Sequence, residues 1–127
     1  MALVIDLPIP PRTVSPNARP HWAAVAKAKA KMRADGKLAA KSAIREQRPS
    51  GLPWKSATVK PLFFFRVNRK RDRDNFGAML KAYYDSLQDA GVIVNDCGLI
   101  PHPPVMCVDK DDPRVELIVA ESVEEER

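Results

Sequence analysis

Residues 69–100 read RKRDRDNFGAMLKAYYDSLQDAGVIVNDCGLI and hold the strongest structural signal in the chain. Apolar side chains recur here at the spacing of a helix that buries one face; they are Phe76, Met79, Leu80, Tyr83, Tyr84 and Leu87. The pattern predicts an amphipathic helix over 74–90, with Gly91 as its C-terminal stop. A short apolar strand over 92–94 is expected to follow.

The segments before this helix predict further elements. Residues 2–7 (ALVIDL) read as a strand, and the prolines between 8 and 20 predict a loop. Residues 21–48 are rich in Ala, Lys and Arg and predict a helix. Asp35-Gly36 is expected to break or weaken that helix, because Gly costs about 1 kcal/mol there.

Three more strands are predicted, over 57–67, 99–109 and 114–121. Pro61 requires a bulge or a sheet edge within the first of them, because proline cannot donate a ladder hydrogen bond. The resulting order, β-α-β-α-β-β-β, predicts an α/β (mixed α+β) fold. We expect a mixed β-sheet packed with two main helices.

The bulk composition suits one small domain. The chain has 127 residues, so we expect a single domain over 1–127, with a frayed acidic tail at 122–127. Hydrophobic residues make up 45% of the chain, which allows a core. The net charge of +5 favours an anionic partner, with nucleic acid the first candidate.

Targeting and cysteine signals point to a cytoplasmic protein. The chain has no apolar run long enough for a membrane span, and its start, MALVIDLPIPP, lacks the basic region of a signal peptide. Two cysteines suggest no disulfide framework. Cys97, His102 and Cys107 match no usual zinc spacing and lack a fourth ligand, so we expect two buried thiols instead.

Asp72 and Asp74 stand inside the most basic segment of the chain. On an extended backbone they would face one side, with Cα atoms about 6.6 Å apart. Carboxylate oxygens at that spacing suit Mg²⁺, which takes a few carboxylates with water and substrate phosphate. Asp74 also suits the positive end of a helix dipole.

Lys81 and Asp96 are the next candidates. Lys81 lies almost two helical turns beyond Asp74, on the same side, and can reach back toward the aspartates. The alternative makes it an ordinary ion pair with Asp85. Asp96 follows the short apolar strand and can be aimed at a neighbouring loop; the alternative is a simple turn at Asn95-Asp96.

Cations surround the aspartates, and they are Arg66, Arg69, Lys70, Arg71 and Arg73. They concentrate phosphates near the acids and keep the carboxylates ionised for metal binding. A carboxylate cluster within a basic surface is what a metal-dependent nuclease needs.

The stretch RDRDNFGAMLKAYYDSLQDAGVIVND resembles the signature of the RusA-like endodeoxyribonucleases, the Holliday junction resolvases. The matching elements are Asp72, Asp74, Asn75, Lys81, Asp85, Leu87, Ala90-Gly91 and Asp96. The segment LPIPPRTVSPNARPHW is similar to the family's Pro-rich entry, with Ser15-Pro16-Asn17 as its Ser-x-Asn segment, and RVELIVAE resembles its last strand. Asn95 stands where the family has the first acid of a pair.

The resemblance implies a homodimer that makes paired, Mg²⁺-dependent nicks across a four-way DNA junction, in DNA recombination and repair. Members of the family are often phage or prophage encoded. It implies that Asp72, Asp74 and Asp96 hold Mg²⁺, with Mn²⁺ as a substitute, and that Lys81 stabilises developing charge. The expected DNA-binding residues are Asn17, Arg66, Arg69, Lys70, Arg71 and Arg73.

Two other functions remain open on the sequence. A non-catalytic nucleic-acid-binding module explains the charge, but it does not explain acids among the cations. A metal-dependent hydrolase of small phosphates explains the acids, but the sequence has no Gly-rich phosphate loop.

Overall fold

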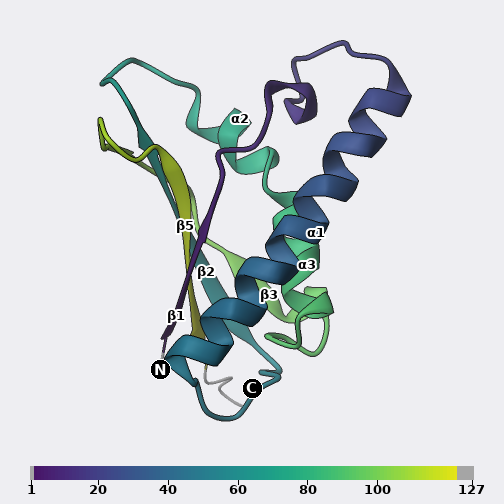
Figure 1. Cartoon of the computed structure of the whole chain (residues 1–127), viewed down its shortest axis with the longest axis vertical. Coiled ribbons are helices and arrows are strands. Elements are labelled where there is room, and N and C mark those ends of the chain that lie inside the picture. Colours follow the sequence, from purple (N-terminus) through teal and green to yellow (C-terminus); the bar gives the residue numbers. More distant parts are fainter. Residues whose placement is uncertain (1, 123–127) are drawn as a thin grey trace, which may run out of the picture.

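A computed structural model of the chain describes residues 2–122, which form one mixed five-stranded sheet with helices on one face (Figure 1). The α+β fold expected from the sequence is thereby confirmed. The elements in chain order are β1 (Ala2–Leu7), η1 (Arg12–Val14), α1 (Trp22–Gln47), β2 (Ala57–Phe65), α2 (Arg73–Ala78), α3 (Lys81–Asp89), η2 (Asp96–Gly98), β3 (Leu99–Pro101), β4 (Val105–Val108) and β5 (Arg114–Glu121). The acidic tail falls largely outside the described residues.

Strand β5 lies between β1 and β2 and runs antiparallel to both. On its other side, β2 pairs in parallel with β3 and then with β4. The strand expected over 99–109 is therefore two strands, separated at 102–104. Pro61 of β2 lies opposite the gap between β3 and β4, so the sheet has the local edge that was predicted there. Pro61, Pro103 and Pro104 have no N–H to donate, which explains why pairing stops at this point.

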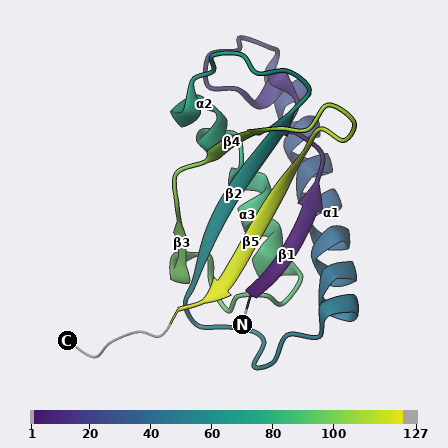
Figure 2. The same ribbon diagram turned by 90° about the vertical axis from the view of Figure 1, so that its left-hand side faces the viewer.

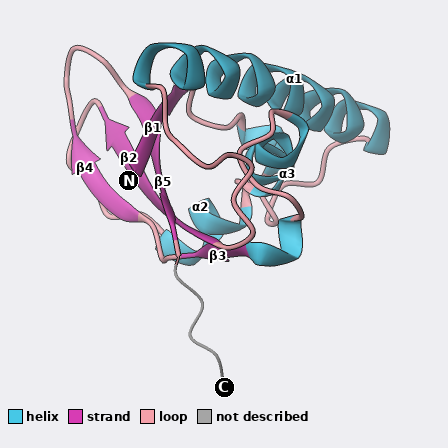
Figure 3. Cartoon of the chain, turned by 90° about the horizontal axis from the view of Figure 1, so that it is seen from below, coloured by secondary structure: helices cyan, strands magenta, loops and turns pink. Residues whose placement is uncertain are grey.

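The core lies between the sheet and the helices α1 and α3, which cover the same face in all three views (Figures 1, 2 and 3). Alternate residues of the strands point into it, as the period-2 pattern requires. The largest fully buried side chains include Trp54, Tyr83, Phe63, Leu3, Ile5, Leu80, Leu87 and Ile93. No helix formed by residues 2–122 covers the opposite face of the sheet (Figure 2).

Helix α1 continues through Gly36, so the break expected at Asp35-Gly36 is wrong. Gly36 is buried against α3, and a Cβ added to it would lie 2.2 Å from Oγ of Ser86. Glycine is therefore required by the close approach of the two helices, and their packing offsets its poor helix propensity. The ion pair of Arg33 with Asp89 joins the same two helices, with 2.8 Å between Nη2 and Oδ1.

The helix expected over 74–90 is two helices, α2 and α3, separated by Met79 and Leu80. At this point the backbone N–H groups of Met79 and Leu80 donate three residues back, to the carbonyls of Phe76 and Gly77. The tighter turn changes the helix direction, so that Phe76 packs on the sheet while Tyr83 lies in the core.

Helix α3 ends where the sequence predicts it to end. Gly91 has a φ of 81°, which confirms it as the helix stop. The strand expected over 92–94 is not formed, because Ile93 makes only an isolated bridge with Trp54.

Candidate functional site

Asp72 and Asp74 lie at the start of α2, both exposed. Asp72 is the N-cap: its Oδ1 accepts a hydrogen bond from the backbone N–H of Asn75 at 3.2 Å. Asp74 lies in the first turn, as its fit to the helix dipole predicted. The extended arrangement of 72–74 is wrong, because the cap at Asp72 starts the helix at Arg73.

Lys81 contacts two carboxylates. Its Nζ lies 2.6 Å from Oδ1 of Asp85 and 3.5 Å from Oδ2 of Asp96. The hydrogen bond to Asp85 is the main cause that raises the pKa of the Lys81 ammonium, and Asp96 adds to the effect. The ion pair with Asp85 is thus present, as the alternative interpretation of Lys81 expected, and the same amine also faces Asp96.

The turn before β3 fixes the position of Asp96. The Asn95 side chain accepts a hydrogen bond from the Cys97 N–H at 3.1 Å and so caps η2. The Asp96 N–H donates to Oε1 of Gln88 on α3, also at 3.1 Å. The turn expected at Asn95-Asp96 is confirmed, and Asn95 has a structural role there.

The acids come from two places in the fold. Asp72 and Asp74 follow the loop after the last residues of β2, whereas η2 leads into β3, which pairs with the first residues of β2. Within residues 2–122, no three His, Cys, Asp or Glu side chains are grouped closely enough to hold a metal ion. The donor chemistry of Asp72 and Asp74 still fits Mg²⁺, which is commonly bound through one or two carboxylates and substrate phosphate.

The cations of the loop 66–73 divide into two groups. Arg71 is half-buried over the Phe65 ring, at 3.8 Å from its centroid, and donates to the carbonyls of Val67 and Arg69. Arg66 donates to the Lys110 carbonyl. These two arginines therefore hold the loop in place. Three other cations of the loop are exposed and face solvent, namely Arg69, Lys70 and Arg73.

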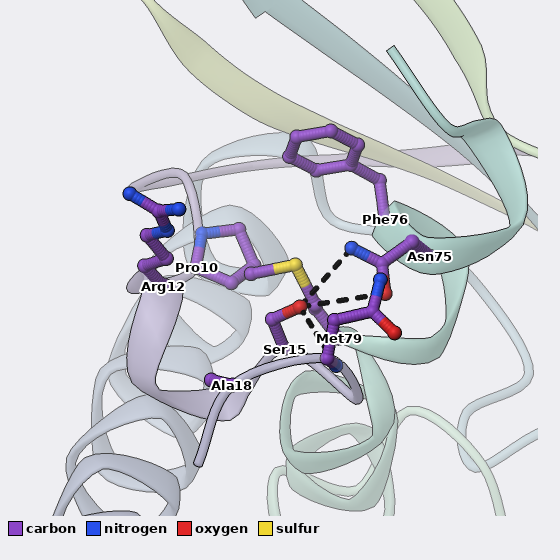
Figure 4. Close-up of a pocket in the computed structure, with 8 residues that line it drawn as sticks. Pro10, Arg12, Ser15, Ala18, Asn75, Phe76 and Met79 are labelled. Carbon is purple, nitrogen blue, oxygen red and sulfur yellow. Dashed lines mark hydrogen bonds between the residues drawn. The ribbon is translucent and has the colours of Figure 1, made fainter. Parts of the chain in front are cut away.

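A cavity of about 430 Å³ lies between the N-terminal loop and α2 (Figure 4). It is lined by Pro10, Arg12, Ser15, Asn17, Ala18, Asn75, Phe76 and Met79. Nδ2 of Asn75 donates to Oγ of Ser15 at 3.1 Å, and the backbone N–H of Asn17 donates to the same oxygen at 3.3 Å. Asn75 matches the family signature, but the sequence predicted no role for it. Its position directly after Asp74 is the feature that could have connected the cavity with the acids.

Cys97, His102 and Cys107 do not form a group that could hold a zinc ion. Cys97 is exposed and Cys107 is only half-buried, so the expectation of two buried thiols is wrong. The reason is that Cys97 lies in the surface turn η2 rather than in a strand. His102 is exposed in the gap between β3 and β4.

Comparison with models of known protein families and with curated proteins gives no match. Among the helices formed by residues 2–122, none has the length and apolar character needed to cross a membrane.

Proposed function

We propose that this chain is a Mg²⁺-dependent endodeoxyribonuclease that resolves four-way DNA junctions by paired nicks, in a cytoplasmic setting. The observation that carries the proposal is the exposed pair Asp72 and Asp74 at the end of a loop with exposed cations. The two acids stabilise the start of α2, but they repel the phosphate backbone and would weaken a surface built only to bind DNA. A divalent ion held by the acids reverses that repulsion.

Asp72 and Asp74 are the residues that would hold the metal, together with water and substrate phosphate, whereas Asp96 is not grouped with them and lies beside Lys81. Such an ion, Mg²⁺ or Mn²⁺, would polarise a phosphate and lower the pKa of a bound water. Lys81 supplies a positive charge beside Asp96. An ammonium at this place stabilises the negative charge that develops on the phosphate. Arg69, Lys70 and Arg73 bind the DNA backbone.

The proposed protein is a homodimer, because a two-fold dimer presents equivalent sites to the two strands of a junction. The sheet face without helices supports a contact between subunits. Side chains on it alternate with the buried ones, and apolar members are Val4, Ile118, Leu62, Phe64 and Val105. Val4 pairs with Ile118, and Leu62 with Val105, so the apolar residues form two pairs, which Lys60 and Glu116 separate on the same face. Light scattering should give the mass of two chains at micromolar concentration.

The decisive experiment is a cleavage assay on a synthetic four-way junction and a linear duplex of the same sequence. We expect nicks in the junction with Mg²⁺ or Mn²⁺ and none with EDTA. Junction binding without cleavage in any divalent metal would instead identify a non-catalytic nucleic-acid-binding module. Hydrolysis of a small phosphomonoester, with intact DNA, would identify a hydrolase of small phosphates.

A further inference from the structure

We propose that the cavity between the N-terminal loop and α2 binds an unpaired nucleobase of the DNA strand that is cut. This inference rests on the proposed nuclease function and assigns that site a way to select its cleavage position. The cavity is bordered by Ser15 and Asn17 from the loop and by Asn75 and Phe76 from α2 (Figure 4).

The position of the cavity connects it to the candidate acids. Asn75 follows Asp74 directly, and its backbone N–H is the group that Asp72 caps. A strand whose phosphate lies at Asp72 and Asp74 therefore brings a neighbouring nucleotide to the cavity. The N-terminal loop and α2 lie at the same end of the molecule in two perpendicular views (Figures 1 and 2).

The apolar walls of the cavity suit the flat ring of a nucleobase. Pro10, Phe76 and Met79 supply apolar surface on which a base can lie. The Phe76 ring is fixed in place by edge contacts with Phe63 and Phe65, at centroid distances of 5.3 and 5.2 Å. A wall that is already ordered loses little conformational entropy when a ligand binds.

The polar groups suit the edge of a base and its phosphate. A side-chain amide offers donors and an acceptor together, which is the combination that reads base edges. One N–H of the Asn75 side chain is bonded to Ser15, and because no other group among residues 2–122 accepts from this amide, its second N–H can bind a ligand. The lining also includes the guanidinium of Arg12 and contains no carboxylate, so it favours a neutral base with an anionic backbone over a cation.

The base must be unpaired to enter. A concave site cannot reach a base inside the stack, so enzymes with such pockets take the base out of the duplex. Taking a base out of the stack costs least where its pairing or stacking is already weakened, and we expect this to hold at the strand exchange point of a junction. The cavity would then favour branched over linear DNA.

Two measurements test the proposal. In the first, four junctions that differ only in the base next to the cut are cleaved by wild type, Ser15→Ala, Asn75→Ala and the control Ser42→Ala, an exposed serine on α1. In the second, 2-aminopurine is placed at successive positions around the branch point, and its fluorescence is read on binding in EDTA. Melting temperatures of all variants establish that they are folded.

We expect wild type and Ser42→Ala to prefer one base by about tenfold, the discrimination of one good base-edge contact. Asn75→Ala and Ser15→Ala should reduce that preference several-fold, and the fluorescence rise at one position should be lost with it. Folded variants that keep the full preference and the fluorescence rise would overturn the proposal, as would equal cleavage of all four junctions by wild type. If wild type cuts no DNA, the nuclease function fails, and the fluorescence measurement still decides whether the cavity takes a base. Should Asn75→Ala unfold, Ser15→Ala decides.

Discussion

The Nζ atom of Lys81 lies 3.5 Å from Oδ2 of Asp96, so the first residue of α3 faces the first residue of η2. The two side chains are 67% and 49% exposed. An ion pair with that exposure contributes at most about 1 kcal/mol to stability. Its consequence is positional, because it sets a protonated amine beside one of the candidate acids.

Replacing Lys81 tests whether this amine acts in the reaction. We expect Lys81→Ala to slow single-turnover junction cleavage by about 10²–10³, the effect of losing one electrostatic donor. Its melting temperature and junction affinity should change little, since the side chain is exposed and many cations bind DNA. Lys81→Arg should restore part of the rate if charge alone matters.

The matched control for Lys81 is Lys31→Ala. Lys31 makes the same i, i+4 pair, with 2.7 Å to Asp35, on the surface of α1. The Lys31→Ala variant should cleave the junction at the wild-type rate. Equal rates for Lys81→Ala and Lys31→Ala would reduce Lys81 to a helix-surface ion pair.

Asp72→Asn and Asp74→Asn should each abolish cleavage and leave junction binding intact or tighter. Metal binding needs the negative charge, whereas DNA affinity comes from the cations. A nicking assay and a gel shift on the same protein samples measure both properties. Asp111→Asn, at an exposed turn before β5, is the control and should cut normally. Full cleavage by Asp74→Asn would contradict the site assignment.

Gly36→Ala should destabilise the fold by about 1–3 kcal/mol, although alanine is the better helix former. The added Cβ would meet Oγ and Cβ of Ser86 at 2.2 and 2.8 Å. Urea unfolding measures the change in the free energy of unfolding. Lys37→Ala, at the exposed neighbouring position, should stay within about 0.5 kcal/mol of wild type. A more stable Gly36→Ala would show that α1 and α3 pack less closely than described.

The carboxylate of Asp109 makes stability depend on acid pH. The hydrogen bond from Arg114 is the main cause that lowers the pKa of Asp109 below its ordinary value of 3.8. A lowered pKa means that the stabilisation is present above pH 3.8 and is lost as the pH falls through the lower, folded-state pKa. The melting temperature of Asp109→Asn should therefore lie below that of wild type at neutral pH, and the difference should shrink in acid. A difference that grows in acid would contradict the pairing.

Cys97 should react with a thiol reagent in the native protein, because it is exposed in η2. Cys107, half-buried in β4, should react more slowly. Mass spectrometry after brief labelling distinguishes the two sites, and Cys97→Ser should remove the fast reaction. Equal labelling of both cysteines, or fast labelling of Cys107 alone, would contradict the described exposures.

Local patterns in the sequence determined much of the fold. The strand-like composition of 2–7 and 114–121 marked two strands, and the Ala-rich segment after His21 marked α1. Gly91 marked the end of α3. These features depend on residues near one another in the chain, so their propensities and periods are readable without a fold. The candidate acids and Lys81 came from the same local pattern, and their catalytic roles stay predictions.

Only the tertiary structure decided where those elements meet. The contact of Gly36 with Ser86 keeps α1 continuous, against the local propensity of glycine. The turn at Met79 and Leu80 redirects the chain so that Phe76 can reach the sheet, although the apolar spacing alone favours one helix. The physical reason is that packing between distant segments outweighs a propensity of about 1 kcal/mol.

The cavity is another feature that the sequence alone could not predict. The hydrogen bond between Ser15 and Asn75 joins residues 60 positions apart, and no local period encodes such a contact. The sequence determined that a serine, an amide and two acids were present. Their meeting at one end of the molecule was decided by the burial of apolar faces on α1, α3 and the sheet, which places the loop against α2.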